Sequence, residues 1–381
     1  TGNTEIGVYE SLATLGTSNW ILGNQLVSGF FPNKIPNPDL KWERTGQFDI
    51  GLDLGLFNNR LRITTDYYKK KTTDLLYSVA VPATSGYQTM LKNIGSIENQ
   101  GYELSIESDN LTGAFSWTTA FNIAFNRNKV LELGGEEYKE MAEGDGHLKT
   151  GSVRRLIVGE PIGVFYGYRF DGIFQNEEEC KQQTSSASPI GVGLRRYKDL
   201  NGDGKVDAAN DREILGDANP KFFGGLTNTF AYKGFELNVF LQYSYGNKIL
   251  NYNAMELENP TGGQNAYADM VNRWTPENPS NIYPKATTNR ALLVSDRFIE
   301  DGSYLKLKTL SLSYSFPKIN LKHIQGLRLY VTGQNLLTWT KYRGYDPEVS
   351  YRGASTLEAG EDFGGYPQSR TFMFGIKLDI K

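Results

Sequence analysis

The feature that most constrains the fold is a repeated alternation of apolar and polar side chains. In FELNVFLQYSY, which spans Phe235 to Tyr245, the odd positions are apolar and most even positions are polar. The same pattern occurs in QFDIGLDLGLF, FSWTTAFNIAFN and TFMFGIKLDI. A period of two is typical of a β-strand whose two faces meet different surroundings. The chain is therefore expected to be all-β.

The length of these runs indicates which kind of β protein is present. They extend over about ten residues or more, whereas ordinary strands have about five to six and membrane-spanning strands about nine to eleven. Short turns also alternate with long polar segments, which is typical of an up-and-down membrane barrel with short periplasmic turns and long outer loops. The short turns are Phe57–Asn59, Ser108–Gly113 and Lys233–Gly234, and the long segments are Ala80–Lys92, Glu132–Gly159, Asn251–Asp301 and Lys341–Gln368.

We therefore predict an antiparallel transmembrane β-barrel with about eleven strands in this chain. A secreted β-sandwich or β-helix is the alternative, but its strands would be shorter and its outward positions polar. Successive strands of such a barrel alternate in direction. This alternation makes Gly163–Phe174 a downward barrel strand, Leu194–Lys198 a weak upward strand and Lys221–Tyr232 the next downward strand. In SYLKLKTLSLSYSF the apolar phase slips between Leu307 and Leu310, which predicts a β-bulge. The side chains expected to face lipid are Phe48, Leu52, Phe121, Leu241 and Phe374.

One stretch, DLNGDGKVDAAND at 199–211, has the spacing of a calcium-binding loop, and parity puts it on the extracellular side. The oxygen ligands would come from Asp199, Asn201, Asp203, the Lys205 carbonyl, Asp207 and Asp211. The bidentate Glu of a sensor loop is missing, because Asn210 stands at position twelve, and no flanking helices are apparent. We therefore expect a structural calcium ion. A metal-free turn rich in Asp, Asn and Gly is the alternative.

Composition excludes several classes of function. The formal net charge is only -3 with no long block of one sign, so no nucleic-acid footprint is present. Cys180 is the only cysteine and His147 and His323 are the only histidines. This argues against a disulfide framework and against a site built from several histidines. No catalytic motif is found, and we predict that the protein is not an enzyme.

Several blocks, in their order along the chain, resemble one family. They are NPDLKWE (37–43), YYKKKTTDLLY (67–77), NIGSIENQGYELSIES (93–108), FYGYRFDGIF (165–174), DLNGDGKVD (199–207), NPKFFGGLTNTFAYKGFELNVFLQYSYGN (219–247) and GLRLYVTGQNLLTW (326–339). No single block is decisive, but together they are specific. The chain resembles the C-terminal part of a SusC-like (SusC/RagA) TonB-dependent transporter of the bacterial outer membrane.

The resemblance implies a large barrel with an internal plug, energised by TonB through an N-terminal region. It also implies a SusD-like surface lipoprotein that covers the outer face, and import of oligosaccharides released from glycans, or of peptides. The plug, the TonB-contacting segment and the early strands have no counterpart in residues 1–381, and Lys381 stands where the family usually ends in an aromatic residue. We therefore expect this chain to be roughly the C-terminal half of a barrel. A calcium-stabilised binding or adhesion protein without transport stays an alternative.

The long outer segments carry the candidate substrate contacts. These are Tyr252, Asn253, Tyr267, Trp274 and Tyr283. A planar ring can stack on the apolar face of a sugar, and an amide can bind hydroxyl groups. The alternative is that these side chains pack the loops together or contact the partner protein.

Overall fold

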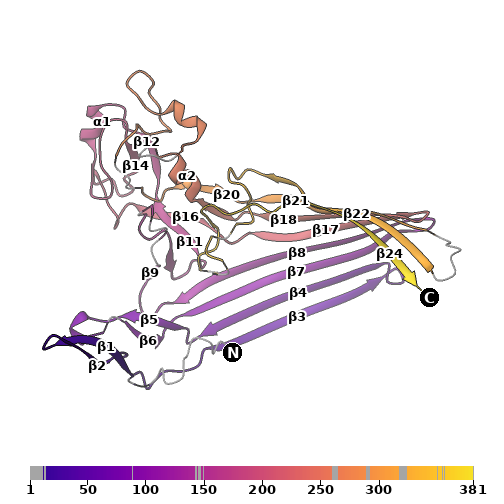
Figure 1. Cartoon of the computed structure of the whole chain (residues 1–381), viewed down its shortest axis with the longest axis horizontal. Helices are drawn as coiled ribbons and strands as arrows, with labels where there is room; N and C mark the ends of the chain where they lie inside the picture. Colours follow the sequence, from indigo (N-terminus) through magenta and orange to yellow (C-terminus); the bar gives the residue numbers. More distant parts are fainter. Residues whose placement is uncertain are drawn as a thin grey trace.

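A nine-stranded antiparallel sheet dominates the computed structural model, which describes residues 12, 14–87, 89–141, 144, 147–148, 150–259, 265–288, 292–316, 324–349, 351–353, 355 and 357–380. Its strands run side by side in the order β24-β22-β21-β18-β17-β8-β7-β4-β3 (Figure 1). Their bounds are β3 Arg44–Leu56, β4 Leu61–Thr73, β7 Ser96–Thr112, β8 Phe115–Glu132, β17 Phe222–Tyr232, β18 Phe235–Tyr245, β21 Tyr304–Ser315, β22 Ile324–Thr340 and β24 Thr371–Ile380. The all-β, antiparallel prediction is confirmed.

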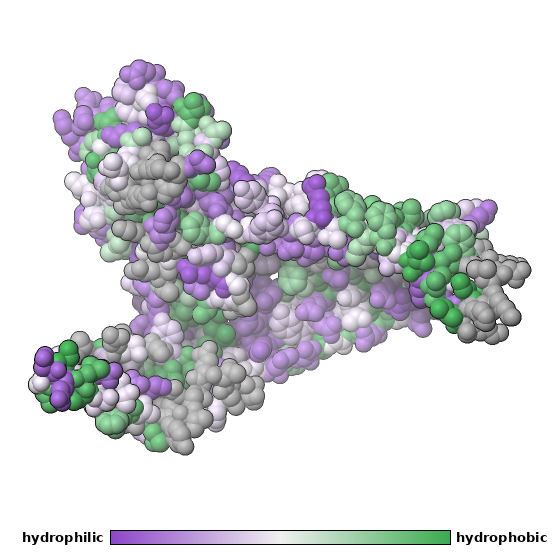
Figure 2. All heavy atoms as spheres, in the orientation of Figure 1, coloured by the Kyte–Doolittle hydropathy of each residue, from purple (hydrophilic) through white to green (hydrophobic). Residues whose placement is uncertain are grey.

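The register of the sheet separates an apolar face from a polar one. Strand pairing places one apolar row side by side: Leu54, Ile63, Ile106, Phe121, Leu226, Leu241, Leu307 and Leu337. One residue away, the row on the opposite face is mostly polar: Asp53, Thr64, Ser105, Asn122, Gly225, Gln242, Lys306 and Thr338. The five side chains expected to face lipid all fall on the apolar face. Figure 2 shows hydrophilic atoms along much of the hollow side of the curved sheet.

Aromatic side chains mark both ends of the apolar face. Near the short turns lie Phe115, Trp117, Phe230, Tyr232, Phe235 and Tyr314, and near the long loops lie Tyr67, Tyr102, Phe125, Phe222, Tyr243, Tyr245 and Trp339. Rings touch within each group, with centroids 4.5 Å apart for Phe235 and Tyr314 and 5.0 Å apart for Phe222 and Tyr245. Phe235 and Tyr245, the outermost aromatic residues of β18, stand ten positions apart, or about 25 Å across the sheet at a typical strand tilt. This is the height of the apolar band of an outer-membrane barrel.

The turns and the bulge follow from local sequence. Phe57, Asn58 and Asn59 all have positive φ between β3 and β4, and Lys233 and Gly234 have φ of 46° and 88° between β17 and β18. The predicted bulge is confirmed, because the β21–β22 register shifts between Leu307 and Thr309. On the other side of β21, the adjacent residues Phe240 and Leu241 of β18 pair with Thr309 and Leu307, so Lys308 is the extra residue that restores the apolar phase.

The chain leaves the sheet after β8 and returns in β17, which pairs directly with β8. The predicted barrel strands at Gly163–Phe174 and Leu194–Lys198 are therefore wrong. These residues form β11 Val164–Tyr168, β12 Phe170–Ile173 and β14 Arg195–Tyr197, short strands outside the sheet. Nine long strands are present in the described part of the sheet instead of about eleven.

The described residues within 133–221, 246–303 and 341–370 together form what we call the outer lobe, at the long-loop end of the sheet (Figure 1). Besides β11, β12 and β14 it contains β9 Tyr138–Glu140, β10 Arg155–Ile157, α1 Glu177–Gln182, β13 Thr184–Ser185, β15 Lys205–Val206, β16 Arg212–Asp217, β19 Lys248–Asn251, α2 Tyr252–Leu257, β20 Ile299–Asp301 and β23 Glu361–Asp362. Two 3-10 helices, η2 Ala268–Asn272 and η3 Asp296–Phe298, complete it. Its dry core includes Phe165, Leu250, Met255 and Phe298.

Two separate hairpins lie beyond the β3 edge of the sheet at the same end. One pairs β1 Leu15–Leu22 with β2 Gln25–Pro32, and the other pairs β5 Leu76–Ala80 with β6 Thr89–Asn93 across the 3-10 helix η1 Ala83–Ser85. Within the described ranges, no helix combines the length and apolar character needed to cross a membrane.

Candidate functional site

The polar face of the sheet is joined to the outer lobe through a buried lysine. Lys306 of β21 extends from the polar face, and its Nζ lies 2.6 Å from Asp346 Oδ1 and 2.5 Å from Glu348 Oε2. Lys308 Nζ adds a contact at 3.0 Å to the same Glu348 carboxylate. The long segment that carries Asp346 and Glu348 is thereby anchored to the polar face of the sheet.

Ionisation keeps this anchor in place. Burial tends to raise the pKa of Asp346 and of Glu348. The hydrogen bonds and charge of Lys306, together with backbone hydrogen bonds to Asp346 and with Lys308 at Glu348, outweigh burial and hold the pKa of both carboxyls below their usual values. Both acids are therefore ionised at neutral pH, and the buried ammonium group has two anionic partners. An ion pair buried in this way depends on both partners being present.

A second buried ion pair lies inside the outer lobe. Arg154 and Glu361 are each 1% exposed, and Arg154 Nε lies 2.9 Å from Glu361 Oε1. The guanidinium also donates to the carbonyls of Gly163 and Ala359, and lies over the Phe165 ring. Sequence analysis did not identify this pair, because 207 residues separate its members.

A third ionic cluster surrounds the end of α2. Asn251 begins the helix, because its side chain accepts a hydrogen bond from the Ala254 amide at 2.9 Å. Beyond the helix, the buried Glu258 carboxylate lies 2.5 Å from Arg297 and 2.7 Å from Arg343. Arg343 also contacts Glu300 at 2.8 Å. These contacts fix the segment that follows β19 against the segment that precedes β20.

Most of the predicted substrate contacts lie inside the lobe. Tyr252 is 0% exposed and belongs to the core, and Trp274 is almost as deeply buried, with its Nε1 donating to Gln175 at 3.1 Å. Tyr267 packs against the core, and burial raises the pKa of its hydroxyl. Tyr283 donates to Asp269 at 3.3 Å and lies beneath the Arg297 guanidinium.

Asn253 accepts a hydrogen bond from the Gly364 amide at 2.8 Å. The structure does not bring the five side chains to one open surface. For Tyr252 and Trp274 it supports the alternative role of packing the loops together. Substrate contact stays a prediction for Asn253, Tyr267 and Tyr283.

The proposed calcium loop has the expected bend, with Gly202 and Gly204 at φ of 75° and 81°. Its side-chain oxygens accept backbone hydrogen bonds: Asp199 from Gly202 and Gly204, each at 2.7 Å, and the buried Asp211 from Leu200 and Asp207. Among the residues placed by the structure, no group of three or more acidic, His or Cys side chains is assembled for a metal. Calcium binding here stays a prediction.

Comparison with known proteins identifies the sheet. Residues 9–336 match the family model described as TonB dependent receptor-like, beta-barrel. The chain belongs to the TonB-dependent receptor β-barrel family. This places it in the bacterial outer membrane, where the apolar face with its aromatic ends meets lipid and the polar face lines the barrel interior.

Relatives narrow the type of TonB-dependent receptor. The chain is 40% identical over 385 residues to TonB-dependent receptor P3 of Formosa agariphila and 30% identical over 361 residues to TonB-dependent receptor SusC of Bacteroides thetaiotaomicron. These alignments cover 99% and 91% of the chain but 38% and 33% of those proteins. The resemblance to SusC-like receptors is therefore confirmed, and the chain spans well under half the length of these relatives.

A solved structure has the same architecture. The chain superposes on the RagAB peptide transporter with a TM-score of 0.78 and 28% identity, over 99% of this chain and 40% of that one. The open-open state of the RagAB peptide importer gives a TM-score of 0.79 at 27% identity. Because the match extends over nearly the whole chain, it includes both the sheet and the outer lobe.

Proposed function

We propose that this TonB-dependent receptor barrel forms part of an importer that moves a nutrient across the bacterial outer membrane. The observation that carries the proposal is the strict division of the sheet into an apolar face with aromatic ends and a polar face. A polar wall suits a solvated passage, whereas a binding or adhesion protein without transport does not require one. Binding and translocation complete this function, with no catalytic step.

The edges of the sheet support a larger barrel. In the part of the chain that the structure describes, β24 and β3 do not pair with each other, and the two strands of the β1–β2 hairpin pair only with one another. Each backbone N–H or C=O group left unpaired at a strand edge in hydrocarbon costs several kcal/mol, so further strands must close the barrel. We assign these strands, a plug and the TonB-contacting segment to another part of the transporter, consistent with the greater length of the relatives.

For the substrate we propose oligosaccharides released from glycans, which suit the polar wall and the ring-rich outer lobe. Peptides are the second candidate, favoured by the architecture shared with the RagAB peptide transporter. We further propose that a SusD-like lipoprotein covers the outer lobe. Purification in mild detergent is expected to recover such a complex, and full transport by the receptor without any lipoprotein would contradict this part.

Uptake by cells tests the transport proposal. A strain without the transporter, complemented with the full-length gene, is expected to take up fluorescently labelled oligosaccharides, and uptake should stop when the proton-motive force is removed. Labelled peptides form the second arm, and preferential peptide uptake would replace the first substrate with the second. Surface binding without energy-dependent uptake of either probe would overturn the transport proposal.

We also propose that calcium stabilises the loop 199–211. All candidate ligand atoms in this loop are oxygens, which calcium prefers. A bound cation would relieve the repulsion among the carboxylates of Asp199, Asp203 and Asp207. Titration with Tb³⁺ as a luminescent probe is expected to show one site that Ca²⁺ displaces and that Asp203→Ala weakens at least tenfold. Asp171→Ala, outside the loop, is the matched control. Unchanged Tb³⁺ binding in Asp203→Ala would refute this proposal.

A further inference from the structure

Arg195 is a buried cation without a carboxylate partner. It lies in β14 at 9% exposure, and its Nη2 donates to the backbone carbonyl of Glu258 at 3.0 Å. Its Nε is buried and has no hydrogen-bond partner. No carboxylate among the described residues forms an ion pair with it, in contrast to the neighbouring Arg196, which pairs with Asp171 and Glu179.

The surrounding charges do not balance. Glu258, whose backbone carbonyl Arg195 contacts, already holds Arg297 at 2.5 Å and Arg343 at 2.7 Å through its carboxylate, and Arg343 shares Glu300. Three guanidinium groups therefore share two carboxylates. Burial lowers the pKa of the Arg195 guanidinium, but arginine stays charged in proteins. A buried charge is costly unless it is paired, so the buried Arg195 is suited to bind an anion.

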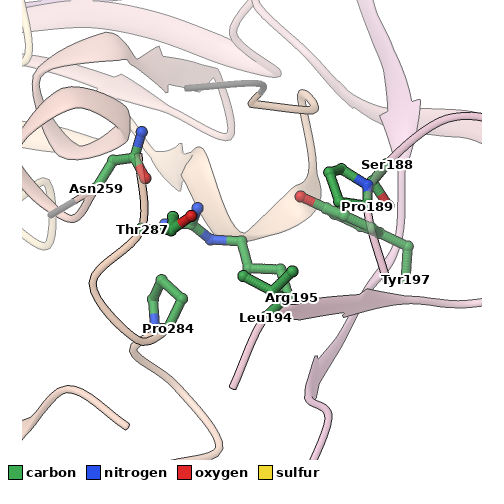
Figure 3. A pocket seen from close by; sticks show the side chains of 8 residues that line it. All are labelled: Ser188, Pro189, Leu194, Arg195, Tyr197, Asn259, Pro284 and Thr287. Carbon is green, nitrogen blue, oxygen red and sulfur yellow. The ribbon is translucent and has the colours of Figure 1, made fainter. Parts of the chain in front are cut away.

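A small half-open cavity lies against Arg195. It has a volume of about 40 Å³, and Ser188, Tyr197, Asn259 and Thr287 contribute polar groups to its lining. Figure 3 shows the Tyr197 hydroxyl and the Arg195 guanidinium directed toward the same space, with Pro189, Leu194 and Pro284 as apolar walls. One water needs about 10–15 Å³ by this measure. The cavity therefore accommodates roughly three heavy atoms, the size of a carboxylate group.

We propose that this cavity is an anion site of the outer lobe that binds a carboxylate group through the Arg195 guanidinium and the Tyr197 hydroxyl. A planar guanidinium fork matches a carboxylate well, and partial burial strengthens the interaction. The carboxylate belongs either to a free small acid or to the end of a longer molecule that enters through the open side. The site is separate from the polar wall of the barrel, so it does not depend on the proposed transport activity.

Calorimetry on the purified full-length transporter tests this site, in a buffer without other small anions. Acetate is expected to bind with saturation, and neutral acetamide of nearly the same shape is expected to show no binding. A short peptide with a free C-terminal carboxylate, compared with its C-terminal amide, tells the two sources apart. Binding of the free-acid peptide assigns a chain end, and binding of acetate alone assigns a small acid.

Two variants locate the effect. Arg195→Met keeps the length of the side chain and removes the charge, and it is expected to weaken acetate binding at least tenfold. Arg196→Gln, which alters the paired neighbour outside the cavity, is expected to leave acetate binding unchanged. Absence of acetate binding, equal binding of acetamide, or full acetate binding in folded Arg195→Met would each overturn the proposal. The comparison of acetate with acetamide uses the wild type, so it decides the matter even where Arg195→Met does not fold.

Discussion

The sheet and the outer lobe satisfy their polar backbone and side-chain groups in opposite ways. In the sheet, strands of 10 to 18 residues pair their backbones along their whole length and expose one apolar and one polar face. In the lobe, strands have two to six residues, a dry core forms, and charged side chains such as Arg154 and Glu361 are buried in pairs. The sheet relies on regular register, whereas the lobe relies on specific contacts between distant segments.

This difference teaches where each region is sensitive. In the sheet, a polar substitution costs most where the side chain meets lipid, because most of the polar face is solvated; the buried Lys306 is the exception. In the lobe, loss of one partner leaves a buried charge uncompensated, and this is costly wherever it happens. Substitutions in the two regions are therefore expected to differ in cost, from a large effect at a buried ion pair to a small one at an exposed ring.

Arg154→Ala is expected to destabilise the outer lobe by about 3–5 kcal/mol, because Glu361 then stays buried without its partner. Hydrogen exchange in 155–168 and 357–362 should accelerate, whereas exchange in β17 and β18 should not. Arg352→Ala serves as the control, since Arg352 contacts the same Glu361 from a more exposed position. Replacing both members, with Arg154→Met and Glu361→Leu, should recover most of the loss. Unchanged hydrogen exchange of these segments in Arg154→Ala would show that the lobe does not require this ion pair.

Leu241→Lys tests the sheet. It places a charge on the apolar face between the two aromatic groups, and such a charge costs up to about 2–4 kcal/mol at the bilayer midplane. Asn238→Lys, on the polar face of the same strand, should cost much less. The free energy of unfolding of the full-length barrel in lipid vesicles measures both. Equal costs for the two variants would remove the distinction between the faces.

The sequence predicted the sheet well because alternation sustained in many long runs is rare outside strands with two different faces. It even located the bulge, since one extra residue, Lys308, reverses the alternation on β21. The same reasoning failed at Gly163–Phe174. There two short strands adjoin in sequence, and Arg169 between them contacts Glu213 and Asp296 of the lobe. Alternation in a single run of about a dozen residues cannot distinguish one long strand from two short strands with a bend between them.

Tyr342→Phe is expected to destabilise the outer lobe less than Arg154→Ala does. The Tyr342 hydroxyl donates to the buried Asp362 carboxylate, and burial with this hydrogen bond raises the pKa of Tyr342. Removing the donor should cost about 1–3 kcal/mol. Tyr345→Phe, at a ring that is 79% exposed, should change nothing measurable. Protease resistance of the lobe in the two variants provides the comparison, and identical resistance would show that this hydrogen bond contributes nothing.

Acidification should have the smallest effect over the ordinary range. Because the pKa values of Asp346 and Glu348 are lowered in the folded state, the stability they add is fully present above their unfolded values of about 4. It is lost only as pH falls through the lowered pKa values. A spin label at Tyr345→Cys, in a Cys180→Ser background, should keep its mobility from pH 7 to pH 5 and gain mobility below about pH 4. A gain between pH 7 and pH 5 would contradict this linkage.

The contacts of the lobe were beyond sequence reasoning. Tyr252 and Trp274 were candidate substrate contacts because long polar loops usually expose their rings, yet both help to fill the lobe. Arg195 carried no motif at all, and its importance depends on Glu258 being occupied by two other arginines. Such charge balances involve residues far apart in sequence, so only the folded chain reveals them.

The central claim is that the sheet is one wall of a membrane barrel, with lipid on one face and a solvated interior on the other. Single cysteines along β18, from Phe235 to Tyr245, test it directly in the Cys180→Ser transporter within intact outer membranes. A water-soluble maleimide should label the even positions, Glu236 to Ser244, and a lipid-soluble one the odd positions. Labelling of both sets by the water-soluble reagent, or no alternation at all, would contradict the account.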